Sequence, residues 1–194
     1  MIDHIELARR RLDGIIEPTP LIESATLSRM LDAEVFIKPE NLQKTGSFKI
    51  RGAYNRIAAL SDEEKARGVI AASAGNHGQA LAYAATRAGV KATIVMPETA
   101  AIAKVAATRN YGQAVILEGI DYQGARVAAG RICGESGAVF VDAYDDAHVV
   151  AGQGTIGLEI AHELGASRRA DAVLVPVGGG GLIAGIAVAL EARS

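Results

Sequence analysis

The sequence predicts an α/β fold in which open, mainly parallel sheets are covered by helices on both faces. From Gly68 onward, short apolar runs alternate with longer stretches of helical periodicity, as do the buried strands and crossover helices of parallel sheets. Turns rich in small residues follow two of these runs, at the strand ends where such sheets bind ligands. With 194 residues, 49% of them apolar, the chain is long enough for one core, or for two small domains that share one.

The N-terminal part is predicted to contain two helices and two short strands. Asp3 and Glu6 mark a helix start, and apolar residues at helical spacing continue it until Gly14. Pro18 and Pro20 then hold the chain extended. The expected elements are a helix at 3–13, a strand at 21–23, a helix from the cap Ser24 to Leu31, and a strand at 34–38.

A helix is predicted over residues 48–60, with Gly46 and Ser47 as its turn and N-cap. Lys49 then lies in the first turn, where the unpaired N–H groups of the helix carry a partial positive charge. This charge, together with burial beside Phe48, favours the neutral amine, which is the form that attacks a carbonyl. The pattern fits a Schiff-base lysine, and it fits a solvated surface lysine equally well.

The second half of the chain repeats strand, loop and helix after a capping box at Ser61 and Glu64. The expected strands are 69–72, 92–96, 114–117, 139–141 and 172–177. The expected helices are 76–88, 100–109, 122–135, 153–164 and one that follows the glycines 178–181.

Composition excludes several classes of function. The 20 basic and 22 acidic residues are balanced and form no long basic run, which argues against a nucleic-acid partner. Cys133 is the only cysteine, which excludes an internal disulfide and fits a reducing cytoplasm. The acidic N-terminus does not resemble a signal peptide. The apolar stretch 172–190 is broken by Pro176 and four glycines, so we expect no membrane span.

No metal site is expected either. The histidines outside the motifs lack the spacing of metal ligands and are assigned to surface or structure; they are His4, His148 and His162.

The four consecutive glycines 178–181 lie between a predicted strand and a predicted helix. Their backbone N–H groups can turn inward without obstruction by Cβ atoms, and phosphate is the natural ligand of that arrangement. A plain tight turn is the structural alternative. A dinucleotide site is another, since Gly179, Gly181 and Ala184 satisfy the loose fingerprint. That interpretation leaves Lys49 unexplained and places the expected acidic residue beyond Ser194.

Three motifs together resemble those of the fold-type II pyridoxal phosphate enzymes, in the serine/threonine dehydratase branch. They stand in the order and spacing of that family, and the resemblance covers the chain from Thr19 to its last helix, in particular to catabolic threonine dehydratases. The motifs are Ser-Phe-Lys-Ile-Arg-Gly-Ala at 47–53, Ser-Ala-Gly-Asn-His-Gly-Gln-Ala at 73–80, and Pro-Val-Gly-Gly-Gly-Gly-Leu-Ile-Ala-Gly at 176–185.

The resemblance implies a role for each motif residue. Lys49 would be the catalytic residue, holding pyridoxal 5'-phosphate and later acting as general base. The residues implied to bind the cofactor are Phe48, Lys49, Asn76, Gly178, Gly179, Gly180, Gly181 and Leu182. Those implied to hold the substrate carboxylate are Ser73, Ala74, Gly75, Asn76 and His77, although His77 fits a helix-start residue without chemistry as well.

The implied activity is a lyase that deaminates L-threonine, and L-serine, to 2-oxobutanoate or pyruvate with ammonia. Related serine racemases carry a serine where this chain has Ala74, so we expect elimination rather than racemisation. Arg51 is interpreted as a solvated helix residue, with a phosphate or interface contact as the alternative, and Asp145 and Asp146 as a turn and helix start. Two alternatives stay open: another β-elimination or β-replacement activity on the same cofactor, or a shortened binding or interaction protein with little activity.

The resemblance also implies a division into two domains. Residues 42–145 would form a small α/β domain, and residues 1–41 and 146–194 would form part of a large cofactor-binding domain. Family members continue well beyond the equivalent of Ser194, so we expect a fragment or a truncated form with an incomplete second sheet. Its exposed sheet edge predicts a homo-oligomer.

Overall fold

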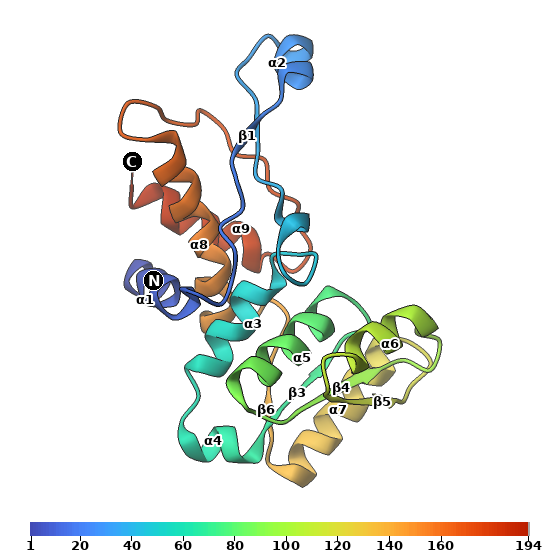
Figure 1. Ribbon diagram of the computed structural model, residues 1–194. Helices are drawn as coiled ribbons and strands as arrows, with labels where there is room; N and C mark the ends of the chain where they lie inside the picture. Colours follow the sequence, from blue (N-terminus) through green and yellow to red (C-terminus); the bar gives the residue numbers. More distant parts are fainter. Residues whose placement is uncertain (194) are drawn as a thin grey trace.

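The computed structural model describes residues 1–193 and confirms the predicted α/β class, with a four-stranded parallel sheet in one half of the molecule (Figure 1). The strand order is β5-β4-β3-β6, and every neighbouring pair is parallel. The strands are β3 (Val69–Ala72), β4 (Ala92–Met96), β5 (Ala114–Leu117) and β6 (Val139–Phe140). The four predicted runs therefore pair in one sheet, and β6 is one residue shorter than expected.

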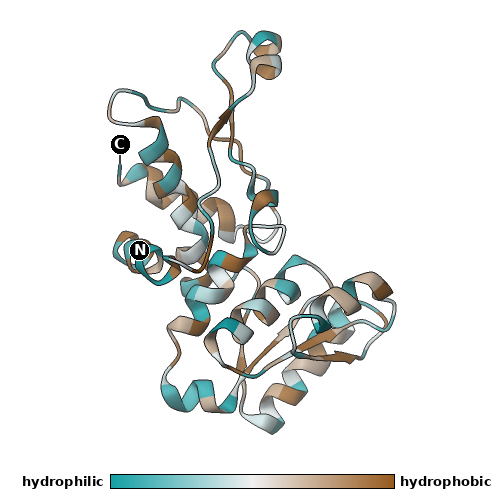
Figure 2. Ribbon diagram, in the orientation of Figure 1, coloured by the Kyte–Doolittle hydropathy of each residue, from teal (hydrophilic) through white to brown (hydrophobic). Residues whose placement is uncertain are grey.

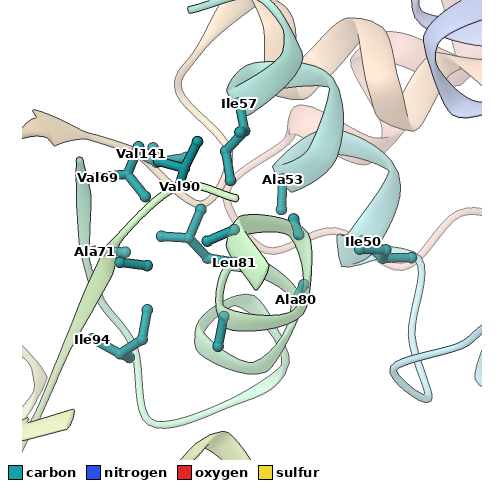
Figure 3. Packing of buried hydrophobic residues seen from close by; sticks show 14 of the residues in the cluster. Ile50, Ala53, Ile57, Val69, Ala71, Ala80, Leu81, Val90, Ile94 and Val141 are labelled. Carbon is teal, nitrogen blue, oxygen red and sulfur yellow. The ribbon is translucent and has the colours of Figure 1, made fainter. Parts of the chain in front are cut away.

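Helices cover both faces of this sheet, which explains why β3 is buried at every position. On one face lie α3 (Lys49–Ala58) and α5 (Asn76–Ala88), whose Ile57 and Leu81 pack over Ala71 and Ile94 (Figure 3). On the other face α7 (Tyr122–Ser136) packs its alanines against the alternate strand residues. The helices α4 (Asp62–Arg67) and α6 (Ile102–Arg109) lie at the periphery, and α4 is strongly hydrophilic (Figure 2).

The second half of the molecule is a helical layer with a projecting arm (Figure 1). The layer consists of α1 (Ile2–Leu12), α8 (Ala147–Leu164) and α9 (Gly181–Glu191). The arm pairs β1 (Ile22–Glu23) with β2 (Phe36–Ile37) as antiparallel strands and carries α2 (Ala25–Leu31) at its tip, followed by a 3-10 turn, η1 (Glu40–Leu42). The prediction of Ser24 as the cap of α2 is confirmed, since its side chain accepts from the Leu27 amide.

Glycines set how closely α8 approaches the helices on either side of it. A Cβ at Gly152 would lie 2.5 Å from the Arg51 carbonyl oxygen of α3. A Cβ at Gly154 would lie 2.9 Å from the Gly185 carbonyl oxygen of α9. Both crossings are thus backbone against backbone. They set the distance from α8 to α3, which begins with Lys49, and from α8 to α9, which follows the glycines 178–180.

Most predicted elements differ from the structure by at most two residues at an end, and two differ by more. Helix α8 begins at Ala147 instead of residue 153, because the Asp146 carboxylate accepts from the amides of His148 and Val149 and so caps an earlier start. Residues 172–177 were predicted to form a strand but pair with no strand of the described chain. They form a segment without regular secondary structure, with Val173 and Val175 packed on a cluster around Ile156 and Leu174 95% exposed.

Candidate active site

The three motifs of the sequence converge on one segment, the loop of residues 141–146 that joins β6 to α8. This loop follows the carboxyl end of a parallel strand, which is where open sheets place their ligands. Each motif makes its own contact with the loop, through a lysine amine, a buried imidazole and a glycine backbone. The loop itself was not singled out as a site in the sequence.

Lys49 is the first residue of α3 and is half-buried. Its Nζ donates to the Ala143 carbonyl oxygen at 2.7 Å and lies 5.2 Å from the centroid of the Phe48 ring. Burial lowers the pKa of this amine below its ordinary value of 10.5, while the negative charge of Asp142 opposes the shift. The predicted environment of Lys49 is therefore present: a helix start, a neighbouring aromatic ring and a raised population of the neutral amine.

Ser47 does not cap this helix, contrary to the prediction. Phe48 occupies the N-cap position in a helical conformation, and no side chain caps the helix. The Ser47 hydroxyl is instead buried without a hydrogen-bond partner among the described residues, as is that of Thr45. The turn ahead of Lys49 thus directs its hydroxyls inward, and Gly46 makes this possible with φ +70°.

The second motif forms the junction between β3 and α5. The Ser73 hydroxyl accepts from the Gly75 amide at 3.2 Å, and Gly75 is the N-cap of α5. Asn76, the first residue of the helix, is exposed, and its side chain has no hydrogen-bond partner in the part of the chain that the structure describes. Ala74 packs against the core at this turn. The helix N-terminus and the Asn76 amide are thus free to receive a ligand.

His77 is buried, with 4% of its surface exposed, and its imidazole faces the loop of residues 141–146. Its Nε2 lies 3.0 Å from the Val141 carbonyl oxygen; since a carbonyl only accepts, Nε2 carries the proton and the unpartnered Nδ1 does not. Burial lowers the pKa of His77 to about 4, and the charge of Lys49 contributes in the same direction. The side chain therefore links α5 to the loop, and any contact with a substrate carboxylate would come from its backbone N–H.

The glycines 178–181 lead into α9, with Gly180 as its N-cap at φ +84°. Their amides donate to no acceptor among the described residues. A Cβ at Gly179 would lie 2.1 Å from Cγ of Tyr144, and one at Gly181 would lie 2.7 Å from the Tyr144 carbonyl oxygen. The loop of residues 141–146 therefore packs directly on the glycine loop, at positions where only glycine fits.

Phe48 and Leu182, both assigned to the site, lie in one apolar cluster around Ile156, Ile160 and Ile186. This cluster joins the start of α3 to the start of α9. The structure thus brings the lysine motif and the glycine motif together through α8 and through the loop that precedes it.

Arg51 is not solvated, contrary to the prediction. It is fully buried, and its guanidinium forms bidentate pairs with Glu40 and Glu159 and donates to Thr155. Lys38 adds a further ion pair to Glu159 at 2.8 Å. Residue spacing on a helix could not reveal this, because the carboxylates come from η1 and from α8. Arg51 therefore connects α3 to η1 and to α8 through ion pairs.

Asp146 and the remaining histidines have structural surroundings. Asp146 caps α8 and pairs with Arg56 of α3 at 2.8 Å, as expected of a helix start. His4 and His148 stack with ring centroids 6.2 Å apart. Within residues 1–193 no group of three histidine, cysteine or carboxylate side chains could hold a metal ion, and no helix is long and apolar enough to cross a membrane.

Sequence reasoning missed Asp142, Tyr144 and Arg126. Asp142 accepts from the amides of Tyr144 and Asp145 through Oδ1 and from Arg126 through Oδ2 at 2.9 Å. The rule that ligands bind beyond the carboxyl ends of strands, applied to the run 139–141, would have directed attention to this loop.

Comparison with known proteins defines the class of protein that this fold and site represent. The chain belongs to the pyridoxal-phosphate dependent enzyme family, whose model matches residues 12–194. The predicted family and its cofactor are thereby confirmed, and the family accounts for the glycine loop in place of a dinucleotide fold.

Particular relatives are closely similar. The L-threonine ammonia-lyase of Thermotoga maritima is 53% identical over 193 residues, which cover 100% of this chain and 47% of that protein. Maize serine racemase superposes with a TM-score of 0.93 at 37% identity, covering 98% of this chain and 57% of that one. A threonine deaminase isoform of Solanum lycopersicum gives 0.92 at 39% identity, covering 98% and 52%. The chain spans about half the length of the relatives it matches.

Proposed function

We propose that this chain carries the lysine and glycine-loop portion of a pyridoxal 5'-phosphate-dependent lyase acting on L-threonine and L-serine. The products are 2-oxobutanoate and ammonia from threonine, and pyruvate and ammonia from serine. The observation that carries the proposal is the convergence of Lys49, the start of α5 and the glycine loop on one segment, residues 141–146. The similarity to a protein named L-threonine ammonia-lyase supports the choice of substrate.

The residues present fit the cofactor. The free amides of the glycine loop at the start of α9 suit a phosphate, and the Tyr144 ring leaves no room there for a side chain on Gly179. The residues proposed to hold the cofactor are Lys49 by its amine, Phe48 and Asn76 beside the ring, and Gly178, Gly179, Gly180, Gly181 and Leu182 around the phosphate. When bound, the cofactor supplies an electron sink that stabilises negative charge on the substrate Cα.

Lys49 is the proposed general base. Its lowered pKa raises the share of neutral amine that can accept the Cα proton at Nζ. The Ala143 carbonyl oxygen, 2.7 Å from Nζ, accepts a hydrogen bond from the amine in either protonation state and so holds it in one orientation.

The start of α5 is the proposed substrate-carboxylate site. Backbone N–H groups of Ser73, Ala74, Gly75, Asn76 and His77 would receive the carboxylate at a helix N-terminus. Ala74 offers no proton to the second face of the Cα carbon, so loss of the β-hydroxyl outcompetes inversion. Ala74→Ser is expected to gain serine racemase activity, and an unchanged product spectrum would contradict this assignment.

The domain division and assembly are part of the same proposal. Residues 42–145 form the small domain, and residues 1–41 and 146–194 belong to the large one. The exposed Leu174 and Val177, beside the glycine loop, support self-association, so we propose a homo-oligomer that acts in the cytoplasm on a small amino acid. Sedimentation as a monomer at micromolar concentration would contradict the oligomer.

The test is the visible absorption spectrum of the protein with pyridoxal phosphate, before and after L-threonine is added, with keto-acid production followed in parallel. We expect a cofactor band that changes with threonine while 2-oxobutanoate accumulates. Lys49→Ala should abolish both, whereas Lys44→Ala, which removes an exposed lysine paired with Glu17, should abolish neither. A band indifferent to amino acids would show a binding protein instead, and faster turnover of serine with sulfide would show β-replacement.

A further inference from the structure

The negative charge of Asp142 raises the pKa of Lys49, against the effect of burial, and so acts directly on the amine. It lies one residue before Ala143, whose carbonyl receives the lysine amine. Only 12% of the Asp142 side chain is exposed, so water screens its charge poorly. His77 also lies within the reach of both charges, and it is neutral above a pH of about 4.

Asp142 is held from two directions. Its Oδ1 accepts from the amides of Tyr144 and Asp145, both at 3.1 Å, which closes the turn that presents Ala143. Its Oδ2 accepts from Arg126 of α7 at 2.9 Å. Burial raises the pKa of this carboxyl, but the hydrogen bonds from the two amides and from Arg126 lower it by more. The pKa of Asp142 is therefore below its ordinary value, and the group is ionised at neutral pH.

Arg126 is itself placed by α7 and the sheet. Its guanidinium carbon lies 5.3 Å from the centroid of the Phe140 ring, a cation–π distance at the end of β6. The side chain is 40% exposed, so its replacement opens no cavity in the core. Arg126 and Asp142 therefore form a charge pair that ties α7 to the loop beside the lysine.

We propose that Arg126 and Asp142 act as positioning residues for Lys49: the pair fixes the turn that presents the Ala143 carbonyl and sets the net negative charge beside the amine. Arg126 carries the charge opposite to that of Asp142, so it reduces the negative field at the amine and with it the stabilisation of the ammonium form. This inference deepens the proposed function and rests on the assigned role of Lys49.

The proposal predicts opposite effects for the two partners. Asp142→Asn keeps an oxygen for the two amides but removes the charge, so the pKa of Lys49 should fall. Arg126→Gln leaves Asp142 uncompensated, so the pKa of Lys49 should rise. If the pair served only to keep the loop folded, either change would admit water and move the pKa of Lys49 upward, toward that of a free lysine.

The experiment measures the pKa of the Lys49 amine in the full chain without cofactor. Acetic anhydride is applied at a series of pH values, and acetylation of the peptide that contains Lys49 is followed by mass spectrometry, with the exposed Lys44 as internal reference. We expect the pH midpoint of Lys49 acetylation to move by roughly half a pH unit or more, downward in Asp142→Asn and upward in Arg126→Gln. Arg126→Lys should restore the wild-type midpoint. Circular dichroism establishes that each variant is folded.

Arg131→Gln is the matched control, since Arg131 lies on the same helix and pairs with Glu118 and Glu135 at the surface. It should leave the midpoint unchanged. Shifts of Asp142→Asn and Arg126→Gln in the same direction, or no larger than that of Arg131→Gln, would overturn the proposal. The measurement needs neither cofactor nor threonine, so a chain that makes no keto acid but shows the opposite shifts contradicts the proposed function alone.

Discussion

Gly152→Ala tests whether α8 fixes the position of the lysine helix. The new Cβ would lie 2.5 Å from the Arg51 carbonyl oxygen and 2.6 Å from Cα of Gly52, where ordinary contacts begin at 3.4 Å. These neighbours are backbone atoms of α3, so no side chain can rotate away. The helix that begins with Lys49 must move by about 0.9 Å, the difference between these distances.

The expected loss of stability follows from two opposing effects. Overpacking a buried contact costs about 1–3 kcal/mol, and alanine regains up to about 1 kcal/mol of helix propensity over glycine. The net loss should be about 1–2 kcal/mol, which for a chain of this size lowers Tm by roughly 5 °C. Displacement of α3 should also weaken binding of pyridoxal phosphate, because Lys49 moves relative to the glycine loop.

Urea and thermal unfolding of Gly152→Ala, compared with Gly130→Ala, provide the measurement. Gly130 lies in α7, where an added Cβ would meet no atom within 4 Å, so its replacement should stabilise the protein by about 0.5–1 kcal/mol. If Gly152→Ala matched the wild type or exceeded it in stability, the close crossing of α3 and α8 would not exist in solution, and the reasoning would be refuted.

Three further predictions concern the site and its supports. Gly179→Ala should weaken pyridoxal phosphate binding, measured by absorbance titration, and Tyr144→Ala in the same chain should recover part of it by removing the ring 2.1 Å from the new Cβ. Burial lowers the pKa of His77 to about 4, so between pH 6.5 and 4 the unfolded chain binds a proton that the folded chain does not. The free energy of unfolding should therefore fall by up to about 3 kcal/mol over this range. Urea unfolding of His77→Gln should show a weaker dependence of stability on pH. Arg51→Gln removes the buried guanidinium from Glu40 and leaves Lys38 as the remaining cation beside Glu159, so it should cost about 3 kcal/mol, against about 0–1 kcal/mol for the exposed Arg131→Gln; equal losses would contradict the buried network.

Sequence alone predicted the parallel strands and most helices because their signals are local. The strand at 69–72 and the helix at 76–88 were predicted with the observed bounds, since burial on both faces makes one a continuous apolar run and the spacing of alanines marks the other. Residues 172–177 have the same apolar composition but formed no strand. Strand formation depends on a partner, and a run of residues does not say whether one is present.

The candidate site was predictable where a motif requires particular residues, and it was hidden where distant segments meet. Lys49 and the four glycines carry their chemistry in residue type and spacing. Arg51 looked like a solvated helix residue because its partners, Glu40 and Glu159, come from two other segments. Asp142 was missed for the same reason. It lies in the loop of residues 141–146, whereas its partner Arg126 lies in α7, and the effect of Asp142 on Lys49 acts through space.

The arrangement also explains why the motifs need the glycines of α8, which carry no chemistry themselves. Gly152 sets the approach of α3, which begins with Lys49, and Gly154 sets the approach of α9, which begins at the glycine loop. Because both contacts are made by the backbone of one helix, the separation between the start of α3 and the start of α9 depends little on side-chain rotamers. The start of α5 is joined to α3 by their shared core, in which Ile50 and Ala53 lie with Ala80 and Leu81, and to the loop of residues 141–146 by the hydrogen bond from His77 to Val141. The proposed carboxylate site is therefore held beside Lys49 by apolar packing between α3 and α5, a different kind of contact from the backbone crossings that α8 makes with α3 and α9.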